Sequence, residues 1–224
     1  MNKSKKILSR PMVIAIAVEL LLNFLAYYGT RVFMGDKYHY DLTNSLDNMI
    51  PVMPAFILIY YGSYLFWIVN YILGCRQDED TAFRFLSADF IAKCICIVIF
   101  VAFPTTNIRP VINEQGVFYD MLRSLYAVDA ADNLFPSIHC LTSWFCFIAV
   151  RGNKNIKFSY KTISLIIAIL ICISTVTTKQ HVLVDVAGGI LIAEACYHLV
   201  KYTGFWKVYK KGIKAIEQRV SKKN

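Results

Sequence analysis

Six apolar runs alternate with short polar segments along the chain. They cover about residues 12–28, 51–73, 85–103, 136–150, 162–177 and 182–200. A membrane-spanning helix needs about 20 mostly apolar residues, and charged or turn-forming residues flank these runs. The pattern therefore predicts an all-α fold, a polytopic membrane protein whose bundle contains six transmembrane helices.

The composition excludes the soluble and the disordered classes of protein. Hydrophobic residues make up 57% of the 224 residues and charged residues only 17%, against about 45–50% and about 25% in an ordinary soluble domain. Six helices of about 20 residues leave too little chain for a second folded unit. We expect one integral-membrane domain over residues 1–224, with residues 201–224 as a basic cytoplasmic tail.

The net charge of +9 is distributed in a way that predicts membrane orientation. With six crossings, eighteen Lys and Arg residues fall on the side of the two termini and five on the other side. Basic residues favour the cytoplasmic side, so both termini should be cytoplasmic and the 104–135 loop should be outside. The clustering of basic residues at the two ends of the chain and in one internal loop is unlike a nucleic-acid-binding surface. The small size favours a bacterial plasma membrane.

Two short segments place reactive side chains at the outer starts of predicted helices. They are Phe-Pro-Ser-Ile-His at 135–139 and Lys-Gln-His-Val-Leu-Val-Asp at 179–185. His181 and Asp185 are four residues apart, so they share one helix face. The carboxylate can accept the proton of one imidazole nitrogen and make the other a better nucleophile. Gly188 and Gly189, one turn further, would allow another helix to approach closely.

The predicted topology brings these segments together. The chain between His139 and His181 crosses the membrane inward and returns, so both histidines lie at the outer boundary, where Arg109 also lies. A single histidine or arginine at this level is usually structural. Convergence of Arg109, Ser137, His139, His181 and Asp185 at one level indicates a catalytic site instead.

These residues resemble the signature motifs of the type 2 phosphatidic acid phosphatase (PAP2) superfamily. The family patterns are Lys, six residues, Arg-Pro; then Pro-Ser-x-His; then Ser-Arg, five residues, His, three residues, Asp. The matching positions lie within about residues 100–190: Arg109 and Pro110, residues 136–139, and Ser174, His181 and Asp185.

The resemblance implies a role for each matching residue. His181 would be the nucleophile that forms a phosphohistidine, and Asp185 would orient it. His139 would protonate the leaving oxygen and then activate water or an alcohol, while Arg109 and Ser137 would hold phosphoryl oxygens. The family's chemistry uses no metal and no cofactor. The partner would be a phosphorylated membrane lipid, a phospholipid or a polyprenyl phosphate, with no nucleic acid involved.

Three departures from the family pattern change the expected phosphate site. Ala102 and Thr175 stand where the family has Lys and Arg, and Ile138 replaces the common Gly. We expect Lys179 to supply one missing cation, with Ser174 as a further phosphate contact.

The departures from the family pattern also leave two types of reaction as alternatives. The histidine segments look closer to the inositol phosphorylceramide synthase-like branch, whose members transfer a phosphoryl headgroup between lipids. A site with fewer cations suits a phosphodiester, which carries one negative charge. The alternatives are therefore a lipid phosphate phosphatase or phosphotransferase, and a phosphodiester headgroup transferase.

A non-catalytic function is the alternative from another class. A carrier could use Glu19, Lys93 and Glu194 with the histidines as a polar path. The reactive residues, however, gather at one rim and no internal repeat is present, and Lys93 is expected to extend its ammonium towards the cytoplasm. A scaffold that lost catalysis would have little reason to keep both histidines and the aspartate.

Overall fold

The computed structural model describes residues 7–222, and its regular structure is helical apart from one pair of very short strands. Lys3, Lys5 and Lys6 of the predicted basic N-terminus lie outside the described residues. The elements are α1 (Arg10–Phe24), the π-helical η1 (Leu25–Gly29), α2 (Thr30–Met34), β1 (Tyr40–Asp41), α3 (Ser45–Met49), the 3-10 helix η2 (Pro54–Phe56), α4 (Ile57–Cys75), α5 (Glu79–Ala102), β2 (Thr105–Thr106), α6 (Val117–Val128), α7 (Ile138–Arg151), α8 (Phe158–Thr177), α9 (Leu183–Thr203) and α10 (Phe205–Ser221).

The helical membrane fold predicted from the apolar runs is confirmed. Within residues 7–222, five helical segments are long and apolar enough to cross a membrane: 10–34, 54–75, 79–102, 158–177 and 183–203. The sixth predicted helix is α7, which is apolar but has only 14 residues. The first helix continues through η1 to Met34, beyond the expected end at residue 28, because residues 30–34 remain mostly apolar.

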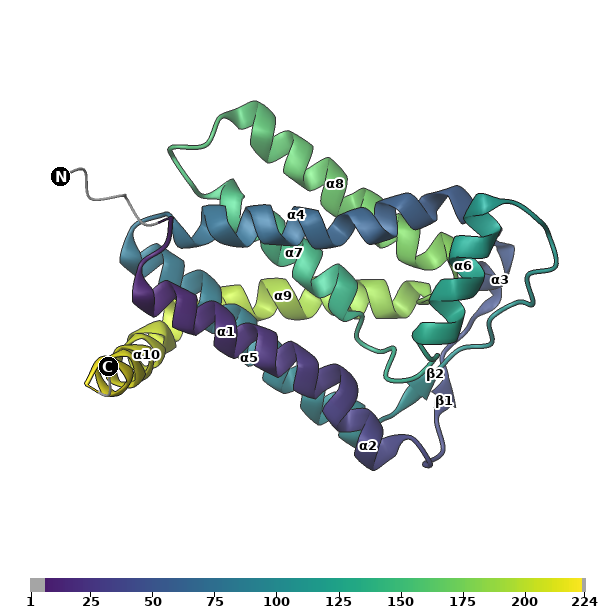
Figure 1. Cartoon of the computed structure of the whole chain (residues 1–224), viewed down its shortest axis with the longest axis horizontal. Coiled ribbons are helices and arrows are strands. Elements are labelled where there is room, and N and C mark those ends of the chain that lie inside the picture. The colour runs from purple at the N-terminus through teal and green to yellow at the C-terminus, as the bar shows by residue number, and fades with distance from the viewer. Residues whose placement is uncertain (1–6, 223–224) are drawn as a thin grey trace.

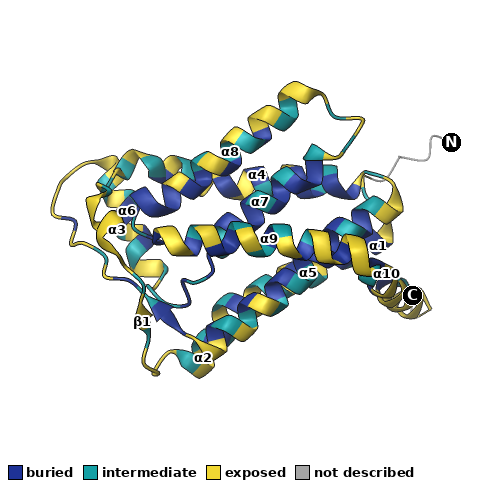
Figure 2. Cartoon of the chain, turned by 180° about the vertical axis from the view of Figure 1, so that it is seen from behind, coloured by how far each residue is buried: buried dark blue, intermediate teal, exposed yellow. Residues whose placement is uncertain are grey.

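Helix α7 is the central helix of the bundle. It packs against α4, α5, α8 and α9, and α1 and α10 pack on the other side of α5 (Figure 1). Buried residues line the inward faces of α4, α5 and α7, whereas exposed stripes run along the outward faces (Figure 2). Many of these exposed side chains are large and apolar, Leu65, Val98 and Leu191 among them, as the lipid-facing surface of a membrane protein requires.

Helix α9 approaches α7 through its glycine pair, as the sequence predicts. A Cβ atom added to Gly189 would lie 2.6 Å from the carbonyl oxygen of Ser137, and one added to Gly188 would lie 2.5 Å from the ring of Phe135. Position 189 therefore requires glycine for this close approach, since the backbone of α7 would have to move. A side chain at position 188 would displace the ring of Phe135.

A buried ionic cluster joins α1, α5 and α10, and it corrects the expectation for Lys93. The Lys93 ammonium is 2.8 Å from Asp89 and 3.6 Å from Glu19, instead of extending towards the membrane surface. The hydroxyls of Tyr71 and Tyr209 donate to Asp89 and Glu19 respectively. Opposite charges and hydrogen bonds offset the high cost of ions in an apolar interior.

The basic C-terminal segment is a helix docked on the bundle. Lys210 forms ion pairs with Glu79 and Asp80, and Lys214 pairs with Glu79, at the start of α5. The start of α1 and helix α10 lie at one end of the molecule, whereas β1, β2, α3 and α6 lie at the opposite end (Figure 1). This arrangement agrees with an even number of crossings.

We expect Gly189→Ala to destabilise the protein by about 1–3 kcal/mol, the usual cost of forcing an extra carbon into a packed interior. The added methyl group would press on the backbone of α7 at Ser137. Thermal unfolding of the purified protein in detergent measures the effect. Gly62→Ala is the matched control, since nothing lies within 4 Å of a Cβ added there; equal stability of the two variants would contradict the close packing.

Candidate active site

The turn between α8 and α9 positions His181. The main-chain N–H groups of Gln180 and His181 both donate to the carbonyl oxygen of Thr175, at 2.9 and 3.1 Å. Asp47 reaches across from α3 and accepts the N–H of Leu183 at 2.7 Å. Thr175, which replaces the family arginine, therefore contributes its backbone to the turn that carries His181.

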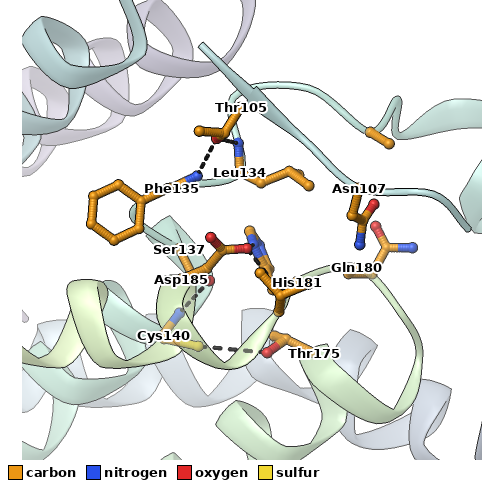
Figure 3. A network of polar contacts seen from close by, with 12 residues as sticks. Thr105, Asn107, Leu134, Phe135, Ser137, Cys140, Thr175, Gln180, His181 and Asp185 are labelled. Carbon is orange, nitrogen blue, oxygen red and sulfur yellow. Dashed lines mark hydrogen bonds and ion pairs between the residues drawn. The ribbon is translucent and has the colours of Figure 1, made fainter. Parts of the chain in front are cut away.

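His181 and Asp185 form the hydrogen-bonded pair that their spacing predicts. His181 Nδ1 lies 3.2 Å from Asp185 Oδ2, which also accepts the N–H of Val182 at 3.0 Å. Both side chains are buried, and Figure 3 shows them side by side. With Nδ1–H donating to the carboxylate, Nε2 is left unprotonated and able to react.

The charge of Asp185 also sets the protonation of His181. Burial alone lowers the pKa of His181, but the hydrogen bond and negative charge of Asp185 outweigh burial and raise it above the ordinary value of 6.5. The pair thus favours a positive charge on the ring, which is the charge that the ring acquires when Nε2 forms a bond.

The start of α7 is joined directly to this pair. The N–H of Ser137 donates to the carbonyl oxygen of Asp185 at 3.0 Å, and the Ser137 hydroxyl caps the helix by accepting the N–H of Cys140 at 3.3 Å. Upstream, the hydroxyl oxygen of Thr105 accepts the N–H groups of Leu134 and Phe135 (Figure 3). Ser137 therefore orients α7 relative to α9.

His139, in the first turn of α7, faces His181. The two ring centroids are 6.3 Å apart, and the His139 ring stacks on Tyr60 at 4.5 Å and packs against Trp67 at 5.1 Å. Its Nε2 is buried and has no hydrogen-bond partner within the protein. The aromatic contacts fix the ring while leaving this nitrogen available to a bound molecule.

Both histidines line a cavity of about 450 Å³. Its polar side includes Gln180 and Asp129, whereas its wall from α1, η1 and α4 is largely aromatic. Phe24 and Tyr28 in this wall are 56% and 49% exposed on the outside of the bundle. The wall therefore separates the histidines from the apolar surface of the molecule. Its aromatic residues are Phe24, Tyr27, Tyr28, Tyr61, Tyr64 and Trp67.

Arg109 reaches the edge of this site through Gln180. Arg109 Nη2 donates to Gln180 Oε1 at 2.7 Å, and Nη1 donates to the main-chain carbonyl of Asp129. Burial lowers the pKa of Arg109, although an arginine side chain stays protonated in proteins. The amide nitrogen of Gln180 is buried without a partner within the protein. The Arg109 guanidinium and the unpaired amide donor of Gln180 therefore lie next to each other at the edge of the site.

Two residues expected from the sequence to contact phosphate, Ser174 and Lys179, donate to main-chain carbonyls in this structure. The Ser174 hydroxyl is buried inside α8 and donates to the carbonyl of Ile171 at 2.7 Å. The Lys179 ammonium donates to the carbonyls of Asp47 and Ile50 at 2.9 and 2.6 Å. Lys179 lines a second cavity of about 360 Å³ that also reaches His181, but its charge is bound to the segment around α3.

Gln180, Asp129 and Tyr60 are site residues that the sequence reasoning missed. Gln180 lies between Lys179 and His181, both of which the sequence patterns single out. That position is the local signal that could have identified Gln180. Asp129 and Tyr60 lie in a loop and a helix with no recognisable motif. In the described part of the chain, no three His, Cys, Asp or Glu side chains are grouped as metal ligands.

A comparison with protein families matches the PAP2 superfamily over residues 39–199, which includes every site residue described above except Tyr27, Tyr28 and Phe24 of the aromatic wall. The chain belongs to the PAP2 superfamily. No curated protein and no solved structure matches it. PAP2 membership supports a phosphatase or phosphotransferase function on phosphorylated lipids in a membrane.

We expect Asp185→Asn to lower the pH at which kcat/KM begins to fall on the acid side of its pH profile, here called the acid limb. His181 can attack only while Nε2 is unprotonated, so activity falls as the pH drops through the raised pKa of His181. The amide removes the negative charge that raises this pKa. The pH profile of nitrophenyl phosphate cleavage in detergent measures the limb. Asp120→Asn, an exposed change on α6, is the control, and an unmoved limb in Asp185→Asn would contradict the assignment.

Proposed function

We propose that this PAP2 protein is a membrane-embedded lipid phosphate phosphatase or phosphotransferase that works through a phosphohistidine at the outer membrane face. The observation that carries the proposal is that the His181–Asp185 pair and His139 face one cavity from two helices, with their rings 6.3 Å apart. A nucleophile with its orienting carboxylate opposite a separate acid is the arrangement that a two-step phosphoryl transfer requires.

The phosphoryl group is proposed to bind between the histidines and Gln180. The first N–H groups of α7 have no partner within a helix and attract anions. Gln180 offers its unpaired amide donor, and Arg109 supplies positive charge beside it. The lipid chains would extend through the aromatic wall towards the bilayer.

In the first step, His181 Nε2 attacks phosphorus and a phosphorus–nitrogen bond forms as the bond to the leaving oxygen breaks. His139 Nε2 gives its proton to that oxygen, and the Asp185 carboxylate stabilises the positive charge on His181. In the second step, neutral His139 removes a proton from water or an alcohol, whose oxygen attacks phosphorus. The phosphorus–nitrogen bond then breaks, and both histidines return to their starting states.

Transfer of a whole headgroup is a variant of the same chemistry. The acceptor would then be a lipid alcohol, and phosphorus would carry the headgroup throughout. The carrier alternative is less well supported, because Lys93 and Glu19 are paired with each other and neither lines the cavity of the histidines.

Replacing the two histidines should separate their roles. His181→Ala should abolish cleavage of both a lipid phosphate and nitrophenyl phosphate, because no phosphoenzyme forms. His139→Ala should lose about 10²–10⁴-fold with the lipid, whose alkoxide needs a proton, yet still form phosphoenzyme with the nitrophenyl ester. Acid-labile phosphate bound to each variant is the measurement.

His198→Ala is the matched control for the loss of an imidazole, since His198 is exposed on α9 near the opposite end of the bundle. It should keep activity with both substrates. Phosphoenzyme in His181→Ala together with none in His139→Ala would reverse the two assignments.

The orientation is tested by reporter fusions. A reporter enzyme that is active only outside the cytoplasm should be active when fused after Asn113, between β2 and α6, and inactive after Asn153, between α7 and α8. The eighteen-to-five distribution of basic residues is the physical reason. Activity of the Asn153 fusion and inactivity of the Asn113 fusion would place the site on the cytoplasmic side.

A further inference from the structure

Asp129 is a carboxylate that lines the cavity of the histidines. Its two side-chain oxygens accept hydrogen bonds from the hydroxyls of Tyr27 and Tyr60. In the described part of the chain, no Lys or Arg side chain forms an ion pair with this carboxylate. Arg109 lies near, but its hydrogen bonds go to the main chain of Asp129 and to Gln180.

The other carboxylate in the cavity wall is neutralised. Asp132 is held by the guanidinium of Arg31 through two nitrogens, at 2.7 and 3.0 Å. Among residues 7–222, no guanidinium offsets the negative charge of Asp129 in the way that Arg31 offsets the charge of Asp132. A carboxylate beside a phosphate site repels a phosphomonoester, which carries nearly two negative charges, at short range and in a poorly screening interior.

The surroundings of Asp129 suit an organic cation. The cavity wall presents the rings of Tyr27, Tyr28, Tyr61, Tyr64 and Trp67, and tyrosine and tryptophan faces attract ammonium groups. A carboxylate among aromatic rings satisfies the charge of an ammonium group without requiring several hydrogen-bond acceptors. At the other side of the cavity, the partnerless Gln180 amide and His139 Nε2 are available to an anion.

We propose that Asp129 and the aromatic wall form a subsite for the ammonium group of a zwitterionic phosphodiester lipid. This proposal rests on the proposed function and narrows its substrate class. The single negative charge of the phosphodiester lies between the histidines and Gln180, and the positive headgroup lies against Asp129. The one guanidinium contributed by Arg109 then matches one phosphate charge, which accounts for Thr175 at the position of the arginine in the family's third motif.

Three chromogenic esters with the same leaving group test the subsite: nitrophenylphosphorylcholine, methyl nitrophenyl phosphate and nitrophenyl phosphate. The first two are diesters that differ by the ammonium group, and the third is a monoester. Asp129→Asn keeps the size of the side chain and one accepting oxygen but removes the charge. It should lower kcat/KM for the choline ester by about tenfold or more, leave the methyl diester within about twofold, and leave or raise cleavage of the monoester.

Asp120→Asn is the control, because it removes the same charge from the exposed face of α6 outside the cavity. Its kcat/KM values should equal those of the unmodified protein for all three esters. An equal fall for both diesters in Asp129→Asn would overturn the proposal, since Asp129 would then act on the reaction and not on the cation.

A binding measurement separates this proposal from the proposed function. Titration calorimetry of His181→Ala, which cannot react, should show glycerophosphocholine binding more tightly than glycerol 3-phosphate or glycerophosphoinositol, and Asp129→Asn in the same background should remove that preference. If no ester forms phosphoenzyme but this preference holds, the proposed chemistry fails and the subsite stands. Tighter binding of glycerophosphoinositol would overturn the ammonium subsite in favour of a polyol site.

Discussion

The close contact between the start of α7 and the glycine pair of α9 is the constraint on which the site depends. The missing side chain at Gly189 lets the backbone at Ser137 reach Asp185, and the missing side chain at Gly188 leaves room for the ring of Phe135. His139 lies in the first turn of α7, and His181 lies in the turn just before α9. The relative position of the two rings therefore follows from a backbone contact and does not depend on long flexible side chains.

Around that contact, an apolar interior makes every polar group costly unless it is paired. Asp185 pairs with His181, and Lys93 pairs with Asp89 and Glu19 in the other half of the bundle. Among the buried polar atoms that have no partner within the protein, His139 Nε2 and the Gln180 amide nitrogen belong to residues that line the cavity. A bound substrate can supply the partner that each of these two atoms lacks.

The membrane-spanning helices could be predicted from the sequence, because their apolar runs are long. The His181–Asp185 pair could be predicted from its four-residue spacing, although His181 lies in the turn before α9 and not within the helix. The positions of Lys179 and Asp129 could not. Lys179 has a left-handed backbone conformation with φ of 55°, so its side chain departs from the direction that helical periodicity gives and reaches the carbonyls near α3. Asp129 follows the end of α6, and its place in the cavity depends on how a long loop folds back over α1 and α4.

The shortness of α7 bears on how deep in a bilayer the proposed reaction would take place. Fourteen helical residues rise about 21 Å, whereas the hydrocarbon layer is about 30 Å thick. With the Arg151 end of α7 placed at one surface, His139 would lie several ångströms below the other. Under the proposed function, a lipid would then have to lower its phosphorus beneath the plane of its neighbours' headgroups, and by more in a thicker membrane.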